Sequence, residues 1–140
     1  MGALTEAQAE IMAVVAQIQQ DWTAYPLVVE AENRTAVNQE KQTNPYLQVS
    51  LNMLSADQLD LAARPRVVQY GQILLAVLAK DGSGSVQART LLDFITPYLE
   101  LKDFTRVRTH AFEVARDTSV RGWTYYPGII NFWYVRESGQ

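Results

Sequence analysis

Apolar residues at helical spacing mark the first part of the chain. They recur every three or four positions, at Ile11, Val15, Ile18 and Trp22. This spacing places them on one face of an amphipathic helix. Thr5 and Gln8 have the spacing of a capping box, which predicts the helix start. Pro26 disfavours helical angles in the residue before it, so we expect the helix to end there and a short strand to follow over Leu27–Glu30.

A period of two replaces the helical period in residues 46–53. Leu47, Val49, Leu51 and Met53 share one face of a strand, and Tyr46, Gln48, Ser50 and Asn52 share the other. We therefore expect one face of a sheet to meet the core and the other to stay polar. The longest candidate strand is Arg66–Ala79, with Gly71 as a bulge or a point of close contact. Its apolar part, Ile73–Ala79, also fits a buried helix, but the turn that ends it favours a strand.

A second helix and two more strands complete the pattern. Ser83 or Ser85 can cap the helix, and Pro97 should stop or kink it. Its apolar face is Val86, Ala88, Leu91, Leu92, Ile95 and Leu99. The turn D-T-S-V-R-G joins strands over Thr105–Arg116 and Thr124–Arg136 as a hairpin. This order predicts an α+β fold: one domain over residues 1–140, with a mainly antiparallel sheet of four to five strands and two helices packed on one face.

Composition narrows the possible functions. The chain has 140 residues and no cysteine, which excludes disulfides, thiolate nucleophiles and thiolate metal sites. Residues 1–10 do not resemble a signal peptide, and the longest apolar run, Ile73–Ala79, is far below the ~20 residues of a membrane span. We expect a soluble protein, made and kept in a cytoplasm, with no membrane partner.

Charge is divided unevenly along the chain. The net charge of −3 argues against a general nucleic-acid binder. Residues 1–63 carry a net charge of −6 and residues 64–140 a net charge of +3. Acidic and basic surfaces on one small domain can attract each other between copies, although an uneven scatter of surface charge explains the numbers equally well.

The segment 80–85, K-D-G-S-G-S, invites comparison with phosphate-binding loops, because the N–H groups at a helix start bind anions. A Walker loop has its lysine after the last glycine, whereas Lys80 precedes the glycines, and Gln87 stands where G-x-G-x-x-G requires glycine. We interpret the segment as a tight turn and helix cap.

The candidates for catalysis or metal binding are equally weak. His110 is the only histidine, and on a strand it would point away from Glu113, which argues against a shared metal. Glu30 and Glu32 could form a carboxylate pair for acid–base chemistry, but Arg34 favours a solvated charge cluster. We expect no enzymatic activity and no cofactor.

Two segments are better suited to contacts between proteins. Residues 31–44 have no apolar periodicity, and a connection of this length either serves binding or is disordered until a partner orders it. Phe132, Trp133 and Tyr134 are consecutive, so they cannot all point inward from one strand. At least one aromatic side chain should therefore be exposed or covered by another chain.

Several segments together resemble one protein family. They are Glu30-x-x-Asn33-Arg34, residues 44–49 (N-P-Y-L-Q-V), Tyr70-Gly71, residues 80–85, Leu92-Asp93-Phe94 and residues 129–132 (I-I-N-F). In this order they resemble the tail terminator-like proteins of long-tailed bacteriophages, from about Tyr25 onward.

The resemblance implies a structural virion protein without catalysis. Such a protein is assembled in the host cytoplasm and forms a ring, a hexamer, on the head-proximal end of the tail tube. It stops the polymerisation of the tail tube protein and offers a surface to the head-completion or connector protein, while DNA passes through without sequence-specific binding. A head-to-tail ring needs two different, complementary surfaces on each subunit.

With this expectation we assign two sets of candidate residues. Those for contact with a partner or a neighbouring subunit are Asn33, Arg34, Asn38, Glu40, Lys41, Asp81, Ser83 and Trp133. Those for the wall of the channel are Gln48, Ser50 and Asn52. Two alternatives remain: another head–tail connector or tail-completion ring protein, and a small ligand-binding α+β module that uses Lys80–Ser85 and His110.

Overall fold

The computed structural model of the chain describes residues 2–31, 39, 41–82 and 85–137. Its elements in chain order are α1 (Ala3–Asp21), β1 (Val29–Ala31), β2 (Tyr46–Gln58), β3 (Arg66–Lys80), α2 (Ser85–Leu99), β4 (Arg108–Val114), β5 (Thr118–Val120) and β6 (Trp123–Glu137). The strands form one six-stranded sheet in the order β1-β2-β3-β6-β4, with β5 paired to β6. Among the strands of these described segments, the β1–β2 pair alone is parallel. The expected α+β fold is confirmed: β1 corresponds to the short strand expected over Leu27–Glu30, and β5, within the segment expected to be a turn, is the added strand.

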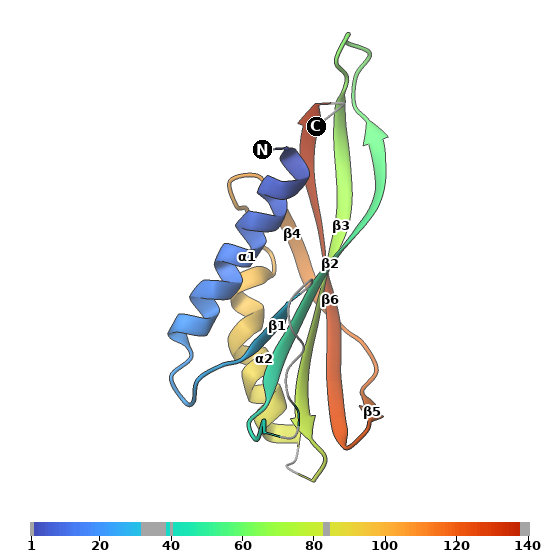
Figure 1. Ribbon diagram of the computed structural model, residues 1–140. Helices are drawn as coiled ribbons and strands as arrows, with labels where there is room; N and C mark the ends of the chain where they lie inside the picture. The colour runs from blue at the N-terminus through green and yellow to red at the C-terminus, as the bar shows by residue number, and fades with distance from the viewer. Residues whose placement is uncertain (1, 32–38, 40, 83–84, 138–140) are drawn as a thin grey trace.

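Both helices lie on the same side of the twisted sheet (Figure 1). The apolar stripe of α1, including Ile11, Val15 and Ile18, packs into one core with the inward residues of α2 and the sheet. From α2 this core takes Ala88, Leu91, Ile95 and Leu99, while Val86 is exposed. The face that meets the helices is called the inner face below, and the opposite one the outer face.

The helix boundaries differ from the sequence prediction. The capping box at Thr5 and Gln8 is wrong, because α1 already begins at Ala3, after Gly2. Pro97 does not stop α2, which ends two residues later. Proline loses little there, since the last turn can continue to Leu99 while the missing N–H affects only one hydrogen bond. Ser85 is the first residue of α2, and Ser83 lies outside the described residues.

Residues 73–79, which could also have been a helix, lie in β3 and confirm the strand interpretation. This strand is central and pairs with β2 on one side and β6 on the other. Both faces of β3 are buried near Lys80, which explains its continuous apolar run. Leu75, Val77 and Ala79 belong to the core on the inner face, and Ala76 and Leu78 are buried in a second cluster on the outer face.

Gly71 lies at a close contact beside a bulge, as the sequence predicts. A Cβ at this position would lie 2.4 Å from Cζ of Phe132 on the paired strand β6. On the other side the register of β2 shifts between Met53 and Ala56. Gln69, which is buried, donates from Nε2 to the carbonyl oxygen of Leu54 inside this bulge, at 3.1 Å. Beyond the bulge, residues 54–66 form a hairpin end that extends past both helices (Figure 1), and we call it the arm.

A second bulge lies in β4. The register against β6 shifts between Thr109 and Phe112, so both of these residues belong to the inner side, where Phe112 packs on the core. Because the bulge adds one residue to β4, the side chains from His110 to Glu113 do not show the strict alternation between the two faces that the sequence prediction required. Both side chains are exposed.

Candidate interaction surfaces

The middle of the outer face carries a row of uncharged polar side chains. The cross-strand partners Asn52, Gln72 and Asn131 come from β2, β3 and β6 in turn. Gln72 donates from Nε2 to Oδ1 of Asn131 at 3.3 Å. Gln48 and Ser50 continue the row along β2, because alternate residues of a strand share a face. We call these five residues the polar row.

The channel-wall prediction named only the part of this row that lies on β2. The structure brings Gln48, Ser50 and Asn52 onto one face as expected, and adds Gln72 and Asn131. The sequence held a signal for Gln72, a polar residue within an apolar strand. Its alignment with Asn52 and Asn131 depends on the strand register, which the sequence leaves open.

The outer face is not polar throughout, which corrects the expectation drawn from residues 46–53. Tyr46 lies at its end but is buried in a second apolar cluster with Ala76, Leu78 and Trp123. The rings of Tyr46 and Trp123 meet edge to face, with centroids 5.4 Å apart. Burial raises the pKa of Tyr46. This cluster closes the end of the sheet where β2 begins and β3 ends.

The turn after β3 is held by the neighbouring hairpin. The backbone N–H of Asp81 donates to the carbonyl oxygen of Gly122 at 2.9 Å. Its carboxylate accepts a hydrogen bond from Oγ1 of Thr124 at 2.6 Å. Gly82 has φ of +86°, the left-handed conformation that glycine adopts most easily. Asp81 thus has a structural role in joining two turns, in addition to being exposed.

Trp133 lies on the outer face, between the inward-pointing Phe132 and Tyr134. Phe132 and Tyr134 are fully buried, and Trp133 is half-buried, as the consecutive aromatic residues require. The guanidinium of Arg108 lies 5.5 Å from the centroid of the Trp133 ring. Arg108 also pairs with Asp103. The Arg108 side chain is 48% exposed and Trp133 is half-buried, so both can be reached from solvent.

The predicted contact residues do not form one site. Trp123 pairs with Lys80, next to Asp81. Trp133 lies ten positions further along β6, which is about 33 Å away along an extended strand. Lys41 is exposed in the segment before β2. Asn33, Arg34, Asn38, Glu40 and Ser83 lie outside the described residues, as does Glu32.

A groove runs between α2 and the β4–β6 side of the sheet. Its volume is about 470 Å³. The apolar part of its wall is formed by Leu92, Pro97, Phe112, Val114, Tyr126 and Pro127. Charged side chains at the groove are Arg89, Asp93, Glu100 and Asp117, of which Arg89 and Asp117 pair at 3.4 Å. This groove could not be predicted from the sequence, because its walls come from α2, β4, β6 and the connection after β4.

The arm carries exposed apolar side chains at its tip, beyond the end of β2. Leu59 is 50% exposed and Leu61 is 94% exposed. Asp60 shapes the tip: its carboxylate accepts hydrogen bonds from the backbone N–H of Arg66 at 3.0 Å and from Nε of the same residue at 2.9 Å. Both bonds lower the pKa of Asp60. Exposed leucines in a loop that also contains aspartates were the only sequence signal for this surface.

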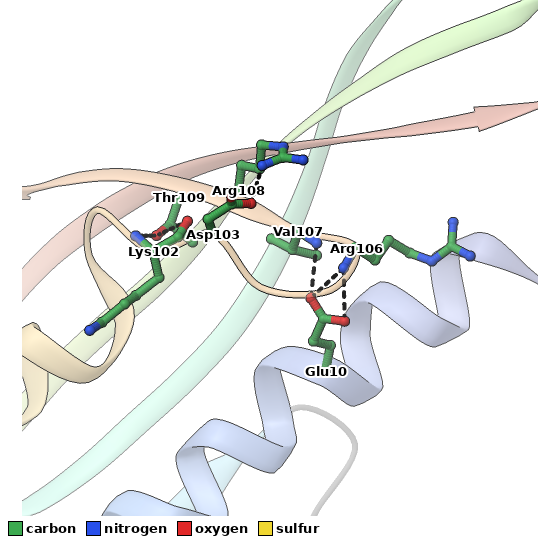
Figure 2. A network of polar contacts seen from close by, with 7 residues as sticks. All are labelled: Glu10, Lys102, Asp103, Arg106, Val107, Arg108 and Thr109. Atoms are coloured by element: carbon green, nitrogen blue, oxygen red, sulfur yellow. Dashed lines mark hydrogen bonds and ion pairs between the residues drawn. The ribbon is translucent and has the colours of Figure 1, made fainter.

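Acidic and basic parts of the chain meet within one subunit. Figure 2 shows the carboxylate of Glu10 on α1 accepting hydrogen bonds from the backbone N–H groups of Arg106 and Val107, before β4. Arg106 also pairs with Glu6, and Arg66 pairs with Asp60. The uneven charge along the sequence is thus partly neutralised inside the fold, where acids of residues 1–63 pair with Arg66 and Arg106.

The metal-site and carboxylate-pair candidates can be compared with the described residues. Among residues 2–31, 39, 41–82 and 85–137, no three His, Asp or Glu side chains are grouped so that they could hold a metal ion. Glu30, the described member of the proposed carboxylate pair, accepts a hydrogen bond from Nε2 of Gln48 at 2.7 Å. Neither α1 nor α2 has the length and apolar character needed to cross a membrane.

Comparison with known proteins supports the fold alone. No protein-family model matches the chain. No curated protein matches it significantly either. A solved structure whose name carries no functional description is similar, with a TM-score of 0.64 and 17% sequence identity. The similarity covers 91% of this chain and 94% of the other. The chain therefore shares a complete fold with a protein of known structure.

Proposed function

We propose that the protein is a bacteriophage tail terminator: a structural subunit that forms a ring, a hexamer, on the head-proximal end of the tail tube. The ring stops polymerisation of the tail tube protein and offers a joining surface to the head-completion or connector protein. In this role the chain has no catalytic activity and no cofactor. It is assembled in the host cytoplasm and resides in the virion.

The proposal begins with the family resemblance of the sequence, and the fold adds to it. Gly71 and Phe132, which belong to two of the segments that carry the resemblance, are about 60 residues apart in sequence but are direct partners across β3 and β6. The close contact of Gly71 with the Phe132 ring makes the residue type at each position depend on the other. Two of the segments that carry the resemblance are therefore in contact in the folded protein.

The observation that carries the proposal is the polar row on the outer face. A ring of subunits around a channel needs a wall past which DNA can move without being held. Cationic side chains would bind phosphate groups, whereas amides and hydroxyls without charge bind them weakly. Asn52, Gln72 and Asn131 supply such a surface on a face that neither α1 nor α2 covers (Figure 1).

Removing the gene from the phage that encodes the protein tests this role. We expect particles with overlong tails of variable length when examined by electron microscopy, and restoration of uniform tails when the protein is supplied. Finished tails lying beside DNA-filled heads would instead indicate a head–tail connector. Tails of normal length joined to heads would refute both.

A substitution in the polar row tests the channel separately. Replacing Asn52 and Gln72 by lysine should leave ring assembly intact but slow DNA release, because the new charges hold phosphate groups. The matched control replaces the same two residues by serine. Equal infectivity of the lysine and serine variants, with intact tails, would show that this row does not face the DNA.

A further inference from the structure

The arm and the groove are two different surfaces at separate places on the subunit. The arm lies beyond the helix-covered part of the sheet, and its residues 54–59 are all exposed (Figure 1). The groove lies between α2 and β4, where Val114 is 77% exposed. A contact between unlike surfaces joins subunits head to tail, and it closes into a ring when the rotation permits.

From these features we propose that the arm of one subunit docks in the groove of the next copy of the same chain. Leu59 and Leu61 enter the apolar part of the groove, and Arg64 faces Asp93. This inference rests on the proposed ring and identifies the surfaces that build it.

The groove is large enough for this occupant. A cavity of about 150 Å³ is sufficient for benzene, which has six carbon atoms. The groove, at about 470 Å³, therefore has space for two leucine side chains of four carbons each. Its walls also match them, since Leu92, Phe112 and Val114 present apolar atoms to the opening.

Charge favours one contact between the two surfaces, that of Arg64, although the arm as a whole is neutral: its charged residues are Asp57, Asp60, Arg64 and Arg66. The groove carries three acidic residues and Arg89, which is already paired with Asp117, so it is negative overall. On the arm, Arg66 is paired with Asp60, and Arg64 makes no ion pair with another described residue. Asp93 is likewise exposed and without an ion pair in the described part of the chain. Docking brings this cation to the acidic groove.

The natural absence of cysteine makes a direct test simple. Two variants, Leu61→Cys and Val114→Cys, are purified separately, mixed at the highest soluble concentration and oxidised. Docking places the two thiols together, so we expect a mixed disulfide dimer in roughly tenfold excess over a control pair, because the local concentration of the thiols is raised. The control pairs Leu61→Cys with Val86→Cys, whose valine is also 77% exposed but lies outside the groove lining.

The symmetry of the contact is read from the same experiment. Leu61→Cys alone and Val114→Cys alone should each give little disulfide dimer, since a head-to-tail contact does not bring identical positions together. A Leu61–Val114 adduct no stronger than the Val86 control would overturn the proposal. So would a dominant Leu61–Leu61 adduct, which indicates a symmetric pair of arms.

An exchange of charges tests the proposed contact between Arg64 and Asp93. Arg64→Asp should weaken the adduct, and Asp93→Arg in the groove-bearing variant should restore it.

Rings on tail tubes without the Leu61–Val114 adduct would refute the docking mode and leave the terminator role intact. The adduct without any effect of gene removal on tails would refute the role and leave the docking mode intact.

Discussion

Replacing Glu10 by alanine should strongly destabilise the protein, because this carboxylate joins α1 to the chain before β4 (Figure 2). Its Oε1 accepts from the N–H groups of Arg106 and Val107, both at 2.9 Å, and its Oε2 lies 3.0 Å from the N–H of Arg106. Val107 is fully buried. Both N–H groups would lose their partner in the variant.

The size of the effect follows from these two donors. A buried donor that loses its partner costs about 1–3 kcal/mol. The two bonds to Glu10 are partly buried, so each contributes about 1.5 kcal/mol. We therefore expect the free energy of unfolding to fall by about 3 kcal/mol in Glu10→Ala. For a domain of this size that corresponds to a decrease in the melting temperature of about 10 °C.

Glu6 provides a matched control on the same helix. It pairs with the side chain of Arg106, but the two side chains are 42% and 30% exposed. Such a pair contributes at most about 1 kcal/mol. Urea unfolding of Glu10→Ala and Glu6→Ala, followed by circular dichroism, measures both changes. Equal losses for the two variants, or a loss below about 1 kcal/mol for Glu10→Ala, would refute this account of the contact.

Three further predictions concern other parts of the fold. Gly71→Ala should lower the free energy of unfolding by about 1–3 kcal/mol, because the Cβ of alanine would overlap the Phe132 ring. The loss should be smaller in a Phe132→Leu background, and equal losses in both backgrounds would contradict this. Burial raises the pKa of Tyr25 from 10.0 to about 12, and its hydroxyl donates to the carbonyl oxygen of Pro45 at 2.8 Å. Between pH 10 and about 12 only the unfolded chain releases the hydroxyl proton, so the free energy of unfolding should fall as the pH rises through this range. The fall should be smaller in Tyr25→Phe, and identical alkaline unfolding curves for the two proteins would argue against this role of Tyr25. Gln69→Leu removes the donor to the carbonyl oxygen of Leu54 in the bulge, so the backbone amides of the arm should exchange hydrogen faster, as measured by mass spectrometry. Unchanged exchange would show that the bulge does not depend on this hydrogen bond.

The sequence predicted those elements of the fold that have one clear period, but not β5, which lies within a segment expected to be a turn. The stripe of α1 and the alternation in β2 are local patterns, and the helix and strand confirm them. Burial of Tyr46 could not be predicted from that alternation. It depends on Trp123, which is 77 residues away and reaches Tyr46 only after β2, β3 and β6 have paired.

The candidate surfaces were less accessible to sequence reasoning. Gln48, Ser50 and Asn52 share a face through alternation alone, but their extension to Gln72 and Asn131 follows from register. The bulge in β4 adds a residue that no alternation pattern reveals, so the relation between residues 110 and 113 could not be derived. The groove combines residues from α2, β4 and β6, and its shape depends on how these elements pack.

The central claim is that this chain forms a ring that ends tail-tube growth. Electron microscopy of the purified protein, mixed with polymerising tail tube protein from the same phage, tests it most directly. We predict closed rings on one end of each tube and tubes that stop growing as the protein is added. Tubes that grow to the same length with and without the protein, and that carry no ring, would contradict the account.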